Sequence, residues 1–297
     1  MEDCQVMQAK PKSRLKTVLH KAMVNVLLLI CFAFLLFPVF WVTTMAFKSH
    51  DDILTWPPKF VFKPTLQNFE NITTAVRTYS LGAVSSDFLK GFGNSLLVTT
   101  LALVVSLLAG IPAAYALGRF RFKGRDDIAF TFLTFRFAPE LLVIIPIYLI
   151  FQRIGLYDTY TGLVWVYQLI TMPMVIWILM SYFEDVSVEL EQASLVDGFS
   201  LFHTFRRIIL PLAKPGIAAA SLLAFIYAWN NFIFALILGS AKVQPVTVSA
   251  LKFITAEKLR YGDIAAGCVL AAIPILVLSL YAQRYMVRGL SLGAVKK

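Results

Sequence analysis

The sequence predicts an all-α, polytopic membrane protein with six membrane-spanning helices. Its 297 residues are 59% hydrophobic, and only 15% of them carry charge. The mean hydropathy is +0.74. A soluble domain of this length needs more polar surface than that to cover its core. Several apolar stretches exceed the ~18 residues that cross a ~30 Å hydrocarbon layer as a helix, so most of the chain is expected to form one bundle in lipid.

The expected spans follow one another along a single membrane domain, residues 23–290. An N-terminal segment, 1–22, precedes it, and a short tail, 291–297, follows it. Pro38, late in the first span, is expected to kink that helix. The spans are residues 23–47, 94–118, 128–152, 162–183, 215–238 and 262–286.

The distribution of Lys and Arg predicts the orientation of these spans. With the N-terminus inside, sixteen of these residues lie in inward-facing segments, and ten lie in the other loops. Most of those ten belong to long loops, which weigh less in the positive-inside rule. We therefore expect both termini in the cytoplasm of a bacterial cell whose inner membrane holds the chain. The formal net charge of +10 is assigned to this bias and not to nucleic acid.

Several classes of catalytic and metal-binding protein find no support in the sequence. The cysteines, Cys4, Cys31 and Cys268, are scattered and form neither a disulfide framework nor a metal-ligand pattern. A phosphate-binding loop needs a Gly-Lys pair, and the sequence contains none. No Ser-His-Asp or Cys-His arrangement stands out. The chain itself is therefore not expected to be an enzyme.

One polar, basic stretch, EQASLVDGFSLFHTFRRIILPLAKPG (191–216), lies between two strongly apolar segments. Ser187 is suited to cap a helix that Gly198 can end in a positive-φ conformation. Ser200 is suited to cap a second helix that Pro211 is expected to stop. Pro215 then suits the first turn of the next span. The stretch therefore predicts a helix–turn–helix on the cytoplasmic side.

The second of these helices carries apolar side chains with no bilayer core to enter. Physics alone leaves two interpretations open. The helix could lie flat among lipid headgroups, as interfacial amphipathic helices do. It could instead insert into a groove on a cytoplasmic partner. The residues concerned are Phe199, Leu201, Phe202 and Phe205.

Residues 192–211 resemble the EAA loop of importer-type ABC transporter permeases, whose pattern is E-A-A-x3-G-x9-I-x-L-P. Gln192-Ala193-Ser194 stand at the EAA positions, and Gly198 follows after three residues. Two positions depart from the pattern, because Gln192 replaces the glutamate and Ser194 replaces the second alanine. Other segments are similar to the carbohydrate-uptake branch, in particular to the second permease of maltose- or glycerol-phosphate-type importers. They are FPVFWVTTMAFKS (37–49), GNSLLVTT (93–100), AAYALGRFRFKG (113–124), IPIYLIFQRIGLYDTY (145–160), AWNNFIFALIL (228–238) and QRYMVRGLSLGAVKK (283–297).

The resemblance implies the type I ABC importer permease fold and a role for the loop 185–211 in coupling. In that family the loop docks in a cleft of the ATPase subunit. The implied partners are a second permease, which makes a heterodimer, two ATP-binding subunits and an extracytoplasmic sugar-binding protein. ATP and Mg would be bound by those ATPase subunits, and this chain would hold no cofactor. The implied coupling residues are Glu191, Gln192, Ala193, Ser194, Asp197, Gly198, Phe199, Phe205, Ile208, Leu210 and Pro211.

Two groups of polar residues inside the expected spans are candidates for the substrate path. Arg136 and Glu140 lie four residues apart, on one face of the third span. They form either a mutually satisfied structural pair or part of a wet cavity that takes sugar hydroxyls or an anionic group. In the fifth span the candidates are Tyr227, Trp229, Asn230 and Asn231, which suit sugar contact but can equally bridge helices.

Two other classes of membrane protein remain as alternatives to an importer subunit. A secondary transporter would carry intramembrane carboxylates for ion coupling, or inverted repeats with broken helices. Glu140 is the single candidate of that kind, and Arg136 lies beside it. A membrane scaffold with a cytoplasmic interaction loop would leave the polar residues of the third and fifth spans unexplained.

Overall fold

The protein is built almost entirely from helices, as the sequence predicts. The computed structural model describes residues 14–74, 76–79, 82–85, 87–135, 137–253 and 260–293. One antiparallel hairpin, β1 (Val76–Tyr79) with β2 (Gly82–Ser85), pairs Val76 with Ser85 and Tyr79 with Gly82. The helices are α1 (Arg14–Ala46), α2 (His50–Leu54), α3 (Gln67–Thr73), α4 (Phe88–Arg119), α5 (Arg125–Phe135), α6 (Glu140–Arg153), α7 (Tyr160–Asp185), α8 (Val188–Val196), α9 (Leu201–Thr204), the π-helix η1 (Phe205–Ile209), α10 (Leu210–Leu212), α11 (Lys214–Trp229), α12 (Ile233–Leu238), α13 (Val246–Ser249), the 3-10 helix η2 (Ala250–Phe253) and α14 (Tyr261–Gly293).

Four helices, α1, α4, α7 and α14, are long and apolar enough to cross a membrane on their own. The number rises to six if each of two bent pairs forms one span. One pair is α5 with α6, bent by 94°, and the other is the segment Leu201–Leu212 with α11, bent by 70°. Residues 128–152, expected as one span, thus form two helices. Pro139 precedes α6 and disfavours helical backbone at the residue before it, which favours a break here.

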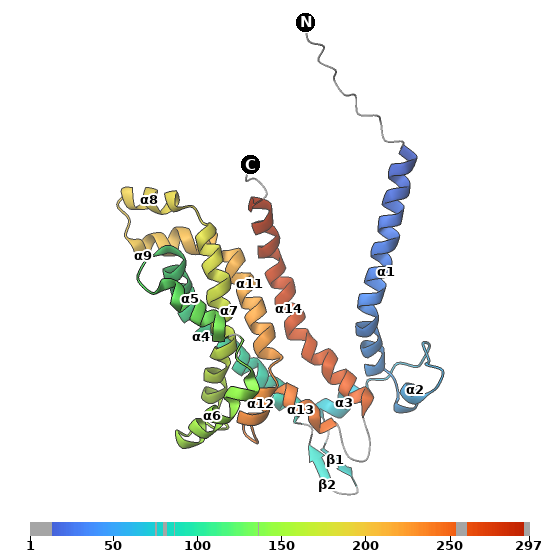
Figure 1. The fold of residues 1–297 in the computed structure, drawn as a ribbon. Helices are drawn as coiled ribbons and strands as arrows, with labels where there is room; N and C mark the ends of the chain where they lie inside the picture. The colour runs from blue at the N-terminus through green and yellow to red at the C-terminus, as the bar shows by residue number, and fades with distance from the viewer. Residues whose placement is uncertain are drawn as a thin grey trace.

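The two ends of the molecule differ in what they carry. The start of α1, the end of α14 and the short helices α8 and α9 lie at one end, which we call the α8 end (Figure 1). Helices α6, α12 and α13 and the β-hairpin lie at the opposite end, which we call the α6 end. The polar stretch therefore lies on the same side of the bundle as both ends of the described chain.

Helix α4 packs against α7 through a stripe of small residues. Ala102, Ser106, Gly110 and Ala114 recur every four positions, so they share one face of the helix, and all four are buried. A Cβ built on Gly110 would lie 2.8 Å from Cγ1 of Val175 on α7. Because lipid gives no hydrophobic driving force between helices, such close approach and its dispersion contacts are what hold two spans together.

Helix α11 also packs against α7 through a stripe of small residues. Its buried face is Gly216, Ala220, Ala224 and Ala228, again four residues apart. A Cβ on Gly216 would lie 2.4 Å from the ring of Tyr182 on α7, so no larger residue fits without displacing that ring. The bundle core is therefore made where α4 and α11 both approach α7.

A small polar network lies inside the α4–α7 contact. Ser106 Oγ donates to Gln168 Oε1 at 2.6 Å and also lies 2.6 Å from Thr171 Oγ1. Gln168 Nε2 in turn donates to the carbonyl of Ala102 at 3.1 Å and to that of Val164 at 2.9 Å. All of these side chains are buried, and their partners within the two helices satisfy them. The network fixes the register of α4 on α7.

The connection between α6 and α7 is fastened by one carboxylate. Asp158 has φ +52 and accepts hydrogen bonds from the backbone N–H groups of Ser240 at 2.8 Å, Lys242 at 3.0 Å and Val243 at 3.0 Å. Its own N–H donates to the carbonyl of Leu238 at 3.0 Å. Partial burial opposes the charge of this carboxylate, but the three amide donors outweigh burial and hold the pKa of Asp158 below its usual value.

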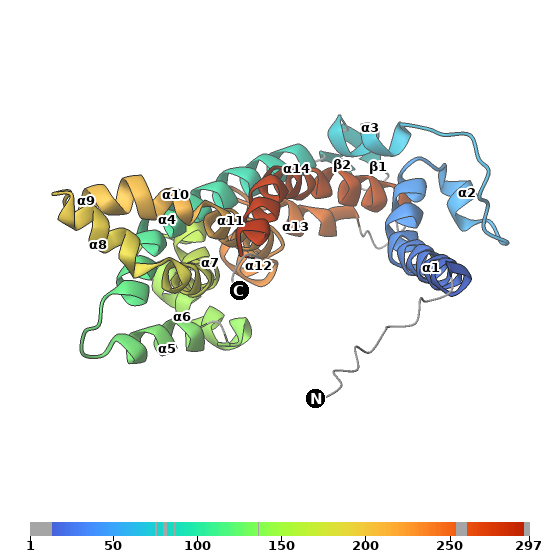
Figure 2. The same ribbon diagram turned by 90° about the horizontal axis from the view of Figure 1, so that it is seen from above.

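Helix α1 stands apart from the other spans along most of its length (Figure 1), and it lies to one side of the bundle when seen from above (Figure 2). Its 18-residue most apolar window is not buried at all, whereas more than half of the corresponding window of α7 is. Only its last turn, with Ala46, joins a buried cluster that includes Ile72, Phe88 and Ala266. The apolar surface of α1 is of the kind that lipid covers.

Candidate coupling element and membrane cavity

Residues 187–212, which we call the loop element, form the helix–turn–helix that the sequence predicts. Ser187 is the N-cap residue of α8, and Gly198, at φ +84, follows the end of that helix. The N–H of Phe199 bonds to the carbonyl of Ser194 at 3.1 Å, which closes the turn. Ser200 Oγ accepts the N–H of His203 at 3.3 Å and begins the second helix. These features are local, and the sequence located each of them correctly.

The second helix does not stop at Pro211, which corrects the sequence prediction. It changes to π-helical geometry over Phe205–Ile209 and continues through Pro211 as α10 to Leu212. A proline has no N–H and its ring crowds the carbonyl four residues earlier. The wider π turn just before Pro211 relieves that crowding, because its hydrogen bonds skip one more residue. The chain bends one residue later, at Ala213.

The two limbs of the loop element are joined by buried hydroxyl groups. Ser194 Oγ on α8 lies 2.8 Å from Thr204 Oγ1 on α9, and both residues are buried. Ile209, on η1, is fully buried in the cluster that also contains Leu179 and Phe183 of α7. The element is therefore a folded unit seated on the bundle and not a loose loop.

The outward side of the loop element is apolar and exposed. Val196 is 86% exposed and Phe202 is 71% exposed, although both are large hydrophobic residues. Phe199 is also exposed, and its ring stacks on His203 with centroids 4.5 Å apart. A surface of this kind marks a contact with a partner or with a membrane interface. Gln192, Ala193, Asp197 and Gly198 lie exposed on the same element.

Most of the remaining predicted coupling residues face inward. Ile208 and Phe205 pack against the buried cluster of α4, α7 and α11, while Leu210 is half-buried and Pro211 is exposed. Glu191 is also turned inward, and its Oε1 accepts a hydrogen bond from Arg119 Nε at 2.8 Å. The motif thus divides into an inner set that seats the element and an outer set that is free to meet a partner.

Electrostatics at the start of α8 favour negative charge. Glu189 and Glu191 lie in the first turn, where the helix dipole stabilises acids. The hydroxyl of Ser187 donates to the Glu189 carboxylate, and this bond lowers the pKa of Glu189. Glu189 is therefore ionised at neutral pH.

A second candidate site is a cavity of about 600 Å³ between α6, α7 and the end of α11. Its wall is mostly apolar, with Met174 and Phe234 among the lining residues. Glu140 and Tyr227 supply its polar groups. The volume of the cavity lies within the range of small-molecule binding sites. Such sites usually have a mostly apolar lining with a few polar groups, as this cavity does.

Asn231 places Glu140 at this cavity. Its Nδ2 donates to Glu140 Oε1 at 3.0 Å, and its Oδ1 accepts the N–H of Phe234 at 3.1 Å. The first bond joins the two breaks in the helices, since Glu140 begins α6 and Asn231 lies between α11 and α12. In many transporters the substrate-binding site is formed at breaks in the membrane helices, where polar groups are available.

The structure separates two other predicted path residues, Trp229 and Asn230, from this cavity. Trp229 is buried in a different cluster, stacked on Phe225 at 5.6 Å and edge-on to Phe92 at 5.6 Å. Asn230 is exposed and caps its own helix by donating to the carbonyl of Ile226 at 2.9 Å. Arg136 lies outside the described residues, so its expected role at the substrate path stays a prediction.

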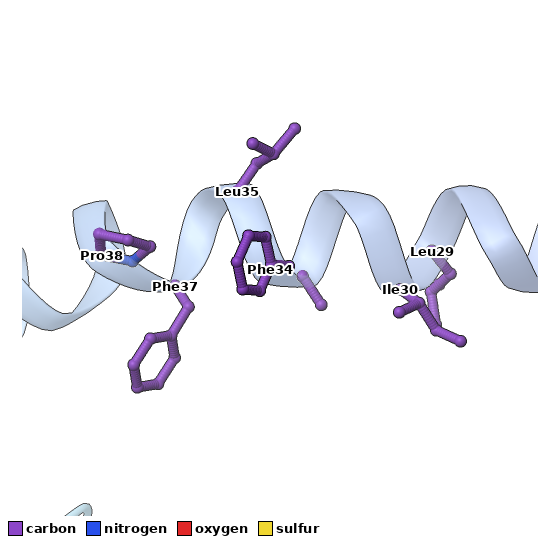
Figure 3. A pocket seen from close by; sticks show the side chains of 7 residues that line it. Leu29, Ile30, Phe34, Leu35, Phe37 and Pro38 are labelled. Atoms are coloured by element: carbon purple, nitrogen blue, oxygen red, sulfur yellow. The ribbon is translucent and has the colours of Figure 1, made fainter.

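A hollow on α1 is not a further binding site. Its lining residues, among them Leu29, Phe34 and Pro38, all belong to that one helix. Figure 3 shows their side chains spread along the helix with no facing element. Among the described residues, no three His, Cys, Asp or Glu side chains converge to hold a metal ion.

Sequence reasoning missed the residues that hold the loop element from outside it. Arg119 and Tyr115 come from α4, which precedes the loop element by about 70 residues, so no local pattern connects them with it. The small-residue stripes of α4 and α11 were also missed, although their four-residue period is visible in the sequence.

Comparison with known proteins agrees with this architecture. Residues 106–292 match the family model described as "Binding-protein-dependent transport system inner membrane component". The chain is 36% identical to the diacetylchitobiose uptake system permease protein DasC of Streptomyces coelicolor, over 92% of this chain and 96% of that protein. It is 33% identical to the trehalose transport system permease protein SugB of Mycobacterium tuberculosis, over 88% and 92%.

Solved structures show the same fold. A chain of a bacterial ABC transporter involved in the import of the acidic polysaccharide alginate has a TM-score of 0.72, with 23% identity. The alignment covers 93% of the present chain and 99% of that one. At this identity the likeness establishes the arrangement of helices and not the substrate.

Proposed function

Because the chain belongs to the inner-membrane components of binding-protein-dependent transport systems, we propose that it is the permease subunit of an ATP-driven importer for a sugar or oligosaccharide. The proposal rests mainly on the loop element. This element is folded against the bundle at the α8 end, and it exposes Val196, Phe199 and Phe202 on its outer side. We assign the outer side to a cleft on an ATPase subunit.

The energy for transport comes from another chain. The sequence has no Gly-Lys pair, so it cannot build a phosphate-binding loop. The proposed assembly contains this permease, a second and different permease, two ATPase subunits that bind ATP and Mg, and an extracytoplasmic binding protein. The binding-protein part of this proposal is supported by a solved bacterial alginate ABC transporter in complex with an alginate pentasaccharide-bound periplasmic protein.

The orientation proposed for the chain places the α8 end in the cytoplasm. Both ends of the described chain lie at the α8 end together with the loop element (Figure 1). The bias of Lys and Arg toward these segments favours the same side. The α6 end, which holds the Asp158 connection and the β-hairpin, then faces the binding protein.

The substrate class follows from the relatives and from the cavity. Relatives are named for diacetylchitobiose, trehalose/maltose and trehalose. Glu140, held by Asn231, and Tyr227 present acceptor and hydroxyl groups on an apolar wall, which suits sugar hydroxyls and ring faces. We place part of the sugar path at this cavity, and a role for Arg136 in that path stays a proposal from the sequence.

The importer assignment is tested by isolating the tagged chain from its native membrane in mild detergent. We expect an ATPase and a second permease to accompany it, and we expect the complex to take up labelled disaccharide into liposomes only with ATP and binding protein. A Gly198→Trp variant should lose the ATPase while keeping the second permease. A chain that purifies alone and transports solute without ATP would show instead a secondary transporter.

The cavity is tested by two neighbouring asparagines. Asn231→Ala releases Glu140 and should raise the KM for sugar uptake by about tenfold, the effect of about 1.4 kcal/mol of lost binding. Asn230→Ala removes the same side chain from the helix end and should leave KM unchanged. Equal KM values for the two variants would remove the cavity from the sugar path.

A further inference from the structure

The chain connects the loop element directly to only two long helices, α7 before it and α11 after it. A third, α4, reaches the element through side chains alone. Its last residue is Arg119, and Tyr115 lies one turn earlier on the same face. Both residues contact the loop element, and neither belongs to the motif that the sequence presents.

The first contact is a nearly buried ion pair. Arg119 Nε donates to Glu191 Oε1 at 2.8 Å, and the two side chains are only 7% and 14% exposed. The other arm of the guanidinium donates to the carbonyl of Ser187 at 3.3 Å. A charge pair shielded from water is much less screened than a surface pair, and the planar guanidinium fixes its direction. This contact attaches α8 to the end of α4.

The second contact attaches the other limb. The ring of Tyr115 lies 4.6 Å from that of Phe205 on η1 and packs edge-on against Phe183 of α7 at 5.5 Å. The hydroxyl of Tyr115 also lies 3.5 Å from Glu191 Oε1. One turn of α4 therefore meets both limbs of the loop element, and Ser194 and Thr204 hold those limbs together.

Helix α4 carries this connection across the bundle. Toward the α6 end it contributes Val98 and Ala102 to the buried cluster that contains Tyr167 and Phe234, and Phe234 lines the cavity. Near its start, Ser95 Oγ accepts the N–H of Val246 at 2.8 Å. A helix of 32 residues is stiff enough to transmit a displacement at one end to the other.

From these contacts we infer that Arg119 and Tyr115 are positioning residues for coupling, through which movement of the loop element drives α4 as well as α7 and α11. This inference rests on the proposed function. It assigns Glu191 to an intramolecular link and leaves Gln192, exposed beside it, for the ATPase. Loss of the link would disconnect ATP turnover from cavity opening without removing the ATPase from the complex.

The test uses the whole complex in proteoliposomes, with sugar uptake and ATP hydrolysis measured in parallel. In Glu191→Gln we expect hydrolysis to continue while uptake per ATP falls about tenfold, within the usual range of coupling between sites. The charge-swapped pair Arg119→Glu with Glu191→Arg should recover most of the ratio. The matched control is Glu184→Gln, which breaks the Arg125–Glu184 pair, 2.5 Å long, at the same end of the bundle but outside the loop element. It should leave the ratio unchanged.

A structural role alone predicts a different pattern. If the ion pair only stabilises the fold, Glu191→Gln lowers the amount of complex, uptake and hydrolysis fall together, and their ratio stays at the wild-type value. That result would overturn the inference. If the yield of Glu191→Gln is too low, Arg119→Lys can be used instead. Lysine keeps the positive charge but cannot donate to both Glu191 and the carbonyl of Ser187. The uptake per ATP of this variant should lie between the values of wild type and Glu191→Gln. A wild-type complex without ATP-driven uptake would instead overturn the proposed function, and the inference with it.

Discussion

Replacing Asp158 tests how the α6–α7 connection is held to the segment that follows α12. Its carboxylate accepts three backbone N–H groups at 2.8 to 3.0 Å, from residues 240, 242 and 243. Hydrogen bonds to a charged group contribute about 1.5–3 kcal/mol each when fully buried. Since this carboxylate is only partly buried, water can replace part of each bond, and we take about 1 kcal/mol for each.

Two substitutions separate the side chain from the backbone conformation. Asp158→Ala loses all three bonds and also places alanine at φ +52, which costs about 1 kcal/mol more, so we expect about 4 kcal/mol. Asp158→Asn tolerates this φ and keeps an oxygen for two of the amides, but its NH₂ group faces the third, so we expect about 1–2 kcal/mol.

The assay is hydrogen–deuterium exchange of the peptide covering residues 238–245, in the full chain in lipid nanodiscs. Each 1.4 kcal/mol of local stability corresponds to about tenfold in exchange rate. We expect exchange to accelerate by more than about a hundredfold in Asp158→Ala and by about tenfold in Asp158→Asn, with amides in the middle of α7 unchanged. Wild-type exchange in Asp158→Ala would refute the assignment of these bonds.

The same site predicts a pH dependence. The pKa of Asp158 is lower in the folded state than in the unfolded chain. Its contribution is therefore fully present above the unfolded value, about pH 4, and is lost as the pH falls through the folded pKa. After correction for intrinsic exchange rates, protection of these amides should weaken below about pH 4 in the wild type and stay constant in Asp158→Asn.

Three further substitutions have definite expected outcomes. Gly216→Ala should lower stability by about 1–3 kcal/mol by thermal unfolding in detergent, because the new Cβ meets a tyrosine ring, whereas Gly93→Ala, with open space and a helical backbone, should be neutral or slightly stabilising. Ser106→Ala should cost about 0.5–2 kcal/mol in the same assay, because it leaves the buried oxygen of Gln168 without its donor, and a smaller cost than that would mean water enters the site. Gly198→Ala should reduce ATPase binding in a pulldown, because φ +84 is strained for alanine although the space is open, and Gly198→Asn should bind better than the alanine variant.

The features that the sequence predicted correctly are set within one or two helical turns. Long apolar runs specify membrane helices because each backbone group in lipid must bond within its own segment. The turn at Gly198 and the cap at Ser200 depend on neighbours three or four residues away. Family membership was equally readable, since the EAA-like spacing of residues 192–211 lies in one continuous stretch.

Other assignments needed the tertiary structure because two or more helices decide them. Trp229, Asn230 and Asn231 are adjacent in sequence, yet one lies in the core, one caps its helix and one holds Glu140. The end of α11 falls among them, and only packing fixes where each side chain points. The helix through Pro211 likewise continues because a π turn, favoured by the seating of Ile209 in the core, offsets the usual cost of proline.

The sequence by itself determined the class of protein, the unbroken membrane helices α1, α4, α7 and α14, the loop element and the need for a separate ATPase, but not the breaks within residues 128–152 and 215–238. The tertiary structure alone decided that Glu191 pairs with Arg119, that Phe205 packs on Tyr115, and that the end of α4 contacts the loop element. The physical reason is the sequence separation over which each interaction acts. Hydrophobic periodicity and capping act between near neighbours, whereas an ion pair across 72 residues depends on how the small-residue faces of α4 and α11 seat against α7.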